Sequence, residues 1–149
     1  MESDPNFPPQ PEKKALVLDT NIILDLYVFN DPATTDLRHA IEAGQLQWLA
    51  TQPMRDELER VLAYPQIAKS MKHHQTDAPA VLAHFDAFAE TVAVAAKASV
   101  TCKDPDDQKF IDLAVARQAC LLSKDRAVLC MQKRLAALGV CAQAALKFD

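Results

Sequence analysis

A short apolar run that ends on an acid is the strongest constraint on what this chain can fold into. Residues 15–18 follow two lysines, and an unbroken apolar run of this length is typical of a strand buried on both faces of a sheet. Asp19 stands at its carboxyl end, and Thr20 or Asn21 can cap a helix that starts at once. The apolar residues of that helix recur at helical spacing: Ile22, Ile23, Leu26 and Tyr27. In an open α/β sheet, ligands bind where a strand passes into a helix in this way.

The rest of the chain alternates between helical and strand patterns. The sequence predicts helices over about 31–43, 52–62, 79–89, 104–117 and 126–138, and further strands over 46–50, 120–123 and 140–142. Pro65 limits the second of these helices, and the polar stretch at His73 and His74 predicts a loop. Gly44 and Gly139 are the only glycines, and each stands between a helix and a short apolar run, as helix C-caps do. This alternation predicts a Rossmann-like α/β fold, a three-layer α/β/α sandwich around a mostly parallel sheet.

The bulk composition indicates one domain. Half of the 149 residues are apolar, which is enough for one core. Residues 1–12 hold four of the nine prolines and little to bury, so we expect a disordered leader before a single domain over 13–149. We expect no membrane partner, because no apolar run approaches the roughly 18 residues of a span. The four cysteines form no CxxC pair, and three lie in apolar segments, so we expect reduced thiols and a cytoplasmic location.

Charge is distributed unevenly along the chain. The formal net charge of -4 argues against a nucleic-acid partner held by counterion release alone. From Lys97 onward, however, nine Lys or Arg residues stand against six Asp or Glu residues, and four of these acids are Asp104, Asp106, Asp107 and Asp125. Basic residues around a local acidic cluster fit a cation that mediates between carboxylates and a phosphate.

Four acids can meet at one rim of the predicted sheet. Asp19 and Asp125 each follow a buried strand, and the carboxyl ends of parallel strands share a rim. Helical phase places Glu57 beside an apolar stripe and Asp107 on the side of Phe110, although phase does not exclude Asp106. Clustered carboxylates cost free energy unless a cation lies among them.

The donor types indicate the ion and the reaction. Oxygen ligands suit Mg²⁺ or Mn²⁺, and without cysteine or histidine at ligand spacing nearby we do not expect zinc. Such a site can lower the pKa of a bound water, orient it towards a phosphodiester and stabilise the departing oxygen. The implied reaction is hydrolysis of a nucleic-acid backbone.

Four segments carry a resemblance to a known family. VLDTN at 17–21, DELERVL at 56–62, CKDPDDQKFIDLA at 102–114 and LLSKD at 121–125 resemble, in order and spacing, the acidic motifs of PIN-domain proteins. The likeness spans residues 14 to about 144 and is closest to the group described as toxin components of toxin-antitoxin systems. It implies a PIN-like fold and a metal-dependent endoribonuclease, with RNA as substrate, an antitoxin as partner and a homodimer as assembly.

The resemblance also implies roles for individual residues. The catalytic, metal-binding acids are Asp19, Glu57, Asp107 and Asp125. The resemblance also implies Ser123 as the polar residue two before the last acid. Our hypothesis adds Thr20, Asn21, Asp106 and Lys124 to Ser123 as supporting or substrate-binding residues. Family members commonly have Thr-Gly before the last acid, where this chain has Ser123 and Lys124.

Each acid also has a purely structural explanation. Taken singly, Asp19 can belong to a helix cap, Glu57 to a solvated helix face, Asp107 to the first turn of a helix and Asp125 to a turn. The ordered coincidence of all four favours the nuclease. One alternative is a phosphatase with Asp19 as covalent nucleophile, although its usual second aspartate is replaced here by Asn21. The other alternative is a non-catalytic scaffold that binds RNA or protein.

Overall fold

A parallel sheet of five strands organises residues 13–146, the part of the chain that this computed structural model describes. The strand order is β3-β2-β1-β4-β5, and every neighbouring pair is parallel. The strands are β1 (Lys14–Leu18), β2 (Leu46–Ala50), β3 (Ala89–Thr91), β4 (Cys120–Leu122) and β5 (Ala142–Gln143). The chain leaves β1 for β2 on one side and later places β4 on the other side. The carboxyl ends of β1 and β4 therefore flank the point where the strand order reverses, which is where ligands bind in such sheets.

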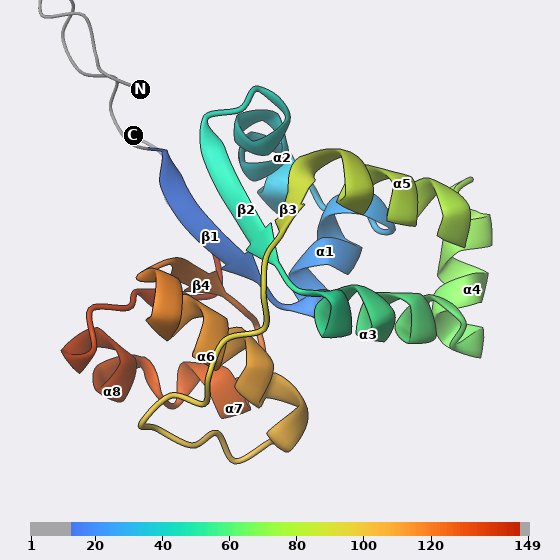
Figure 1. The fold of residues 1–149 in the computed structure, drawn as a ribbon. Coiled ribbons are helices and arrows are strands. Elements are labelled where there is room, and N and C mark those ends of the chain that lie inside the picture. Colours follow the sequence, from blue (N-terminus) through green and yellow to red (C-terminus); the bar gives the residue numbers. More distant parts are fainter. Residues whose placement is uncertain (1–12, 147–149) are drawn as a thin grey trace, which may run out of the picture.

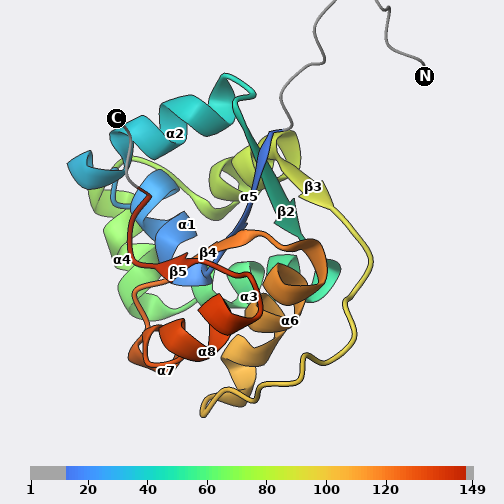
Figure 2. The same ribbon diagram turned by 90° about the vertical axis from the view of Figure 1, so that its left-hand side faces the viewer.

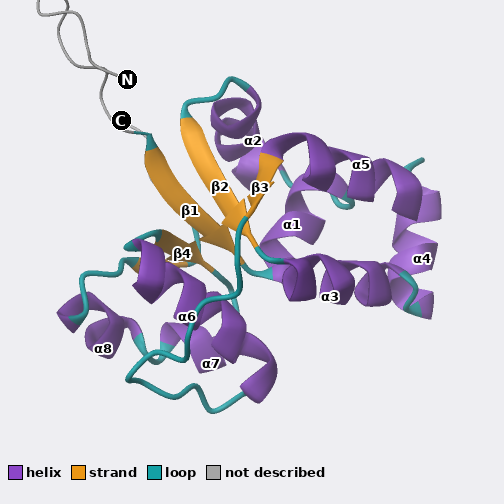
Figure 3. Cartoon of the chain, in the orientation of Figure 1, coloured by secondary structure: helices purple, strands orange, loops and turns teal. Residues whose placement is uncertain are grey.

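Helices cover both faces of the sheet, as the sequence predicts for a three-layer sandwich. Figures 1 and 3 show the helices that precede β3 on one side of the sheet and those that follow β3 on the other. The first group is α1 (Thr20–Tyr27), α2 (Thr35–Glu42), α3 (Gln52–Leu62), α4 (Pro65–His73) and α5 (Ala78–Phe88), and the second is α6 (Gln108–Arg117), α7 (Arg126–Leu129) and α8 (Gln132–Ala137). Two 3-10 helices, η1 (Pro32–Thr34) and η2 (Pro105–Asp107), precede α2 and α6. Within residues 13–146, every helix is too short or too polar to cross a lipid bilayer.

The sheet is buried because large apolar side chains pack against it from both layers. On the side of α1 and α5, the Trp48 ring lies 5.2 Å from the Phe85 ring in an edge-on arrangement and 6.4 Å from the Tyr27 ring. In α6, Phe110 and Ile111 are fully buried. Burying one such side chain contributes roughly 1.5–3 kcal/mol, so these contacts fix the position of the strand ends that carry the acids.

Both glycines end helices, as predicted. Gly44 has φ +74° after α2, and Gly139 has φ +82° after α8. L-residues with a side chain rarely adopt this backbone conformation, which lets the chain turn back into β2 and towards β5.

Two predicted segments differ in the structure. The stretch at His73 and His74 was expected to form a loop, but α4 extends as far as His73. This helix starts at Pro65, and Ile67 and Met71 bury one of its faces. The single helix expected over 126–138 is broken into α7 and α8 at Met131, whose φ of -96° and ψ of 6° leave the helical range while its side chain stays fully buried.

Strand β3 was not predicted at all. It has three residues, none of them fully buried, and its only partner in the described sheet is β2, so it lacks the apolar run that marks β1 or β4. The last strand was expected over 140–142 and lies at Ala142–Gln143, and the strand expected to include Ser123 ends at Leu122. The predicted leader, and the last three residues of the predicted domain, lie outside the described residues.

A long connection without helix or strand carries the chain from β3 to η2. Figure 2 shows it passing along the edge of the molecule before α6 begins. Side chains of α6 hold it in place: Asp112 Oδ1 accepts from Ala98 N at 2.8 Å, and Gln108 Oε1 accepts from Cys102 N at 2.6 Å. The connection therefore delivers η2, and Asp107 with it, to a fixed position.

Candidate metal centre

Asp19 lies where β1 ends and α1 begins. Its backbone N–H donates to Leu122 O at 2.9 Å, which joins the ends of β1 and β4. Asp19 occupies the N-cap position of α1, so the expectation that Thr20 or Asn21 caps this helix is wrong. Its side chain makes no capping hydrogen bond and instead accepts from Ser123 Oγ at 2.6 Å. Asp19 is buried, with 4% of its surface exposed, and its carboxylate faces the end of β4, so capping does not explain it.

Ser123 and Asp125 form the turn after β4. Ser123 is fully buried, and its hydroxyl oxygen accepts from Asp125 N at 3.0 Å while it donates to Asp19. Asp125 Oδ1 accepts from Ala127 N at 2.9 Å and so caps α7. One hydroxyl thus ties together two segments that are more than a hundred residues apart in sequence.

Asp107 is the third acid of the site, at the end of η2. The Asp104 side chain accepts from Asp106 N at 2.9 Å and starts this turn, which leaves Asp106 exposed and Asp107 buried. Asp107 Oδ2 is buried and has no hydrogen-bond partner. Burial and the negative charges of Asp19 and Asp125 raise the pKa of Asp107 to about 8.

These three aspartates form one compact group. One carboxylate oxygen from each of Asp19, Asp107 and Asp125 lies within 4.8 Å of the others. Burial also raises the pKa of Asp19, and the charges of Glu57 and Asp125 raise it further, although the Ser123 hydrogen bond acts in the opposite direction. An unpartnered buried oxygen within an all-oxygen donor set fits a hard divalent cation such as Mg²⁺ or Mn²⁺.

Glu57, the fourth predicted acid, lies beside this group but outside it. Its Oε2 accepts from Thr20 Oγ1, and its Oε1 accepts from Lys109 Nζ at 2.7 Å. Both carboxylate oxygens therefore already have partners, and a ligand role for Glu57 stays a prediction. Lys109 was not predicted to belong to the site, although it lies two residues after Asp107, in the first turn of α6.

Lys124 and Asn21 connect the turn after β4 to α1. Asn21 Oδ1 accepts from Lys124 N at 3.4 Å, and Lys124 Nζ lies 2.5 Å from Asp25 Oδ2. Asp25 is 7% exposed and was not predicted, although an acid within the apolar face of a helix indicates a buried partner. Lys124 thus adds an ion pair beside the aspartates.

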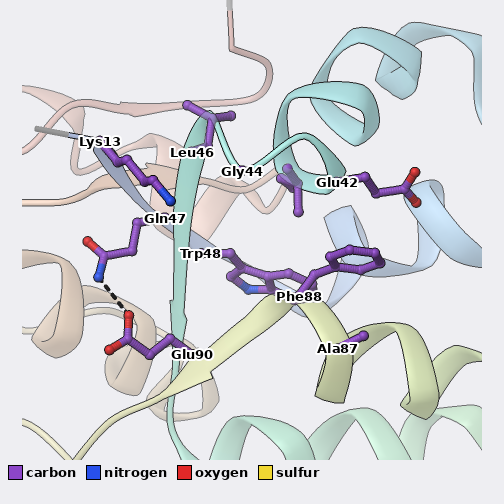
Figure 4. A pocket seen from close by; sticks show the side chains of 10 residues that line it. Lys13, Glu42, Gly44, Leu46, Gln47, Trp48, Ala87, Phe88 and Glu90 are labelled. Atoms are coloured by element: carbon purple, nitrogen blue, oxygen red, sulfur yellow. Dashed lines mark hydrogen bonds between the residues drawn. The ribbon is translucent and has the colours of Figure 1, made fainter. Parts of the chain in front are cut away.

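The structure also has a cavity of about 320 Å³ far from these acids. Figure 4 shows Trp48, Phe88 and Glu90 in its lining, and Gln47 Nε2 donates to Glu90 Oε2 at 2.6 Å. The cavity adjoins Lys13 and Leu46, at the amino ends of β1 and β2, whereas Asp19 follows the carboxyl end of β1. None of the predicted site residues lines it.

Comparisons with known proteins agree with this architecture. A family model described as a PIN domain matches residues 15–127. No curated protein matches the chain. Among solved structures, one chain of the crystal structure of VapBC2 from Rickettsia felis bound to a DNA fragment from their promoter is similar, with a TM-score of 0.57 and 15% sequence identity over 86% of this chain and 98% of that one. At this identity the likeness shows a shared fold.

Proposed function

Because the chain belongs to the PIN-domain family, we propose that it is a metal-dependent endoribonuclease that hydrolyses RNA phosphodiester bonds. The observation that supports this most strongly is the group of three aspartates whose oxygens lie within 4.8 Å of one another. Nothing in the packing of the strands requires three carboxylates at one point, with Asp19 and Asp107 buried and Asp125 half-buried. Their mutual repulsion is relieved when a cation binds among them.

Some residues of the site would bind the metal ion directly, and others orient the side chains that bind it. Asp19, Asp107 and Asp125 would bind Mg²⁺ or Mn²⁺, and the unpartnered Oδ2 of Asp107 is an oxygen that such an ion can use. Ser123 fixes the rotamer of Asp19 by its 2.6 Å hydrogen bond. A hydrogen bond of this kind orients the side chain that binds the metal and so raises the affinity for the metal. When bound, a divalent ion lowers the pKa of water, polarises a phosphoryl oxygen and stabilises the leaving oxygen.

Basic residues beside the aspartates provide the contact to RNA in this proposal. Lys124 and Arg126 are exposed on either side of Asp125. Lysine and arginine at such positions bind the phosphate backbone without selecting a base sequence. Arg126 supplies local positive charge that the overall charge of -4 does not, whereas Lys124 would have to leave Asp25 to bind a phosphate.

We further propose that the protein acts as the toxin of a toxin-antitoxin system in the cytoplasm, bound by an antitoxin and able to form a homodimer. The resemblance of its acidic motifs to toxin components supports this. The similar solved structure is of VapBC2, a toxin-antitoxin complex, bound to a DNA fragment from their promoter. This likeness supports an antitoxin partner for this chain.

Cleavage of a mixed RNA pool tests the proposed activity. The wild type should cut RNA with Mg²⁺ or Mn²⁺ and should be inactive with a chelator. Asp19→Asn should reduce cleavage by at least about a hundredfold, because it removes a ligand charge, while circular dichroism shows an unchanged fold. Metal-dependent activity that survives in Asp19→Asn, or cleavage by the wild type in chelator, would contradict the proposal. Hydrolysis of a small aryl phosphate without RNA cleavage would favour the phosphatase instead.

A further inference from the structure

Glu57 is held on both sides by groups that belong to the segments of the metal centre. Thr20, which donates to its Oε2, follows Asp19 directly, and Lys109, which donates to its Oε1, lies two residues after Asp107. The Lys109 and Glu57 side chains are 24% and 16% exposed, so this ion pair is partly shielded from water. Glu57 therefore links the end of β1 to the start of α6.

Lys109 is fixed more firmly than an ordinary surface lysine. Besides Glu57, its Nζ donates to the carbonyl oxygen of Asp106 at 2.5 Å. The same Nζ lies 5.0 Å from the centre of the Phe110 ring, within range of a cation-π contact. The ammonium is thus held at one place beside the acidic group by three independent contacts.

A positive charge at this place changes how many divalent ions the carboxylates can hold. We infer that Lys109 is a positioning residue. Its ammonium occupies Glu57 Oε1, where a second metal ion would bind, so that the centre holds a single divalent ion on Asp19, Asp107 and Asp125. A second ion on Glu57 would have to displace Lys109, because two cations on one carboxylate repel each other. This inference rests on the proposed function and specifies its metal stoichiometry.

Titration of the metal-free protein with Mn²⁺ tests the inference without any activity measurement. Isothermal calorimetry should find one Mn²⁺ per wild-type chain, and electron paramagnetic resonance should show no coupled pair of ions. Lys109→Met keeps the apolar stem against Phe110 but removes the charge, so it should bind a second Mn²⁺ and give a spin-coupled spectrum. The double variant Lys109→Met/Glu57→Gln should return to one ion, because the second ion depends on the Glu57 carboxylate.

Two further variants control for charge and for general effects of substitution. Lys109→Arg retains a cation and should bind one Mn²⁺, as should Lys69→Met, which removes an exposed lysine from α4. Circular dichroism and thermal unfolding establish that each variant is folded. If Lys109→Met does not fold, Lys109→Gln, which keeps a donor for the Asp106 carbonyl, undergoes the same titration.

The outcomes separate this inference from the proposed function. Two ions in the wild type, or one ion in the folded uncharged variant at position 109, would overturn the role of Lys109 and leave the metal-dependent nuclease standing. Absence of Mn²⁺ binding in the wild type would instead contradict the proposed function itself.

Discussion

Ser123 holds together two of the three aspartates through one buried hydroxyl. It donates to Asp19 Oδ2 at 2.6 Å and accepts from Asp125 N at 3.0 Å. Ser123→Ala removes both contacts, so we expect Mn²⁺ affinity to fall about 10- to 100-fold, as for other partners that orient a ligand. Calorimetry on this variant, with the exposed Ser99→Ala as control, measures the effect. Equal affinities in the two variants would show that Asp19 needs no orienting hydroxyl.

Asp107 makes stability depend on pH in the absence of metal. Its pKa is about 8 in the folded chain and 3.8 ordinarily, so between these values the folded state keeps a proton that the unfolded state has lost. The free energy of unfolding should therefore fall as pH rises through this window. Asp107→Asn lacks this titration, and its stability relative to wild type should rise with pH by up to about 1.4 kcal/mol per unit.

Urea unfolding in chelator at several pH values measures this difference. Saturating Mg²⁺ provides the control, because an ion that binds the wild type and not the variant stabilises the wild type. Parallel stability curves for the two proteins in chelator would show that the folded state does not hold the extra proton on Asp107.

Single residues were predictable from the sequence where an acid follows a buried strand. Asp19 follows such a run directly and Asp125 follows one after a short turn, so parallel topology places both on one rim of the sheet. Asp107 was predictable from helical phase behind a Pro-containing helix start. Lys109 and Asp25 were not predictable in the same way. Their importance depends on a partner far away in sequence, Glu57 or Lys124, and no spacing rule relates the members of these pairs.

The two glycines that end helices, Gly44 and Gly139, differ in how much space they leave for a side chain. A Cβ at Gly139 would lie 2.3 Å from Gln118 Oε1, whereas at Gly44 the nearest atom is Lys13 Nζ at 3.8 Å. Gln118 cannot move freely, because its Nε2 donates to Leu138 O at 3.0 Å and to Val115 O at 2.9 Å, at the ends of α8 and α6.

We therefore expect Gly139→Ala to destabilise the protein more than Gly44→Ala does. The backbone term of about 1 kcal/mol applies to both, and the loss of the Gln118 contacts adds roughly another 1 kcal/mol at Gly139. Urea unfolding at constant pH compares the two variants. Equal destabilisation would mean that Gln118 moves aside without cost, and in that case Gln118→Ala should also be nearly neutral.

Elements were predictable from sequence when hydrophobic pattern and end signals agreed. The runs of β1, β2 and β4 and the capped starts of α5 and η2 satisfy both conditions. β3 has neither a hydrophobic pattern nor an end signal. It is a strand because it pairs with β2. The break between α7 and α8 is likewise set by tertiary packing of Met131, because the local sequence has no glycine or proline there.

The whole molecule brings the site together through its strand order. Placing β4 beside β1, although it comes fourth in the chain, sets Ser123 against Asp19 across 104 residues of sequence. Alternating helices and strands predict a parallel sheet but do not fix this order. The sequence therefore placed Asp19 and Asp125 on one rim of the sheet, whereas the contact between Ser123 and Asp19 depends on β1 and β4 being neighbours.

The central claim is that Asp19, Asp107 and Asp125 together bind one divalent cation. Anomalous X-ray diffraction from crystals of the protein soaked in Mn²⁺ tests it most directly. We predict one anomalous peak in contact with carboxylate oxygens of all three aspartates, including Oδ2 of Asp107, and no peak there in Asp19→Asn crystals. Ordered crystals without a peak among these aspartates, or with the ion on other side chains, would contradict the account.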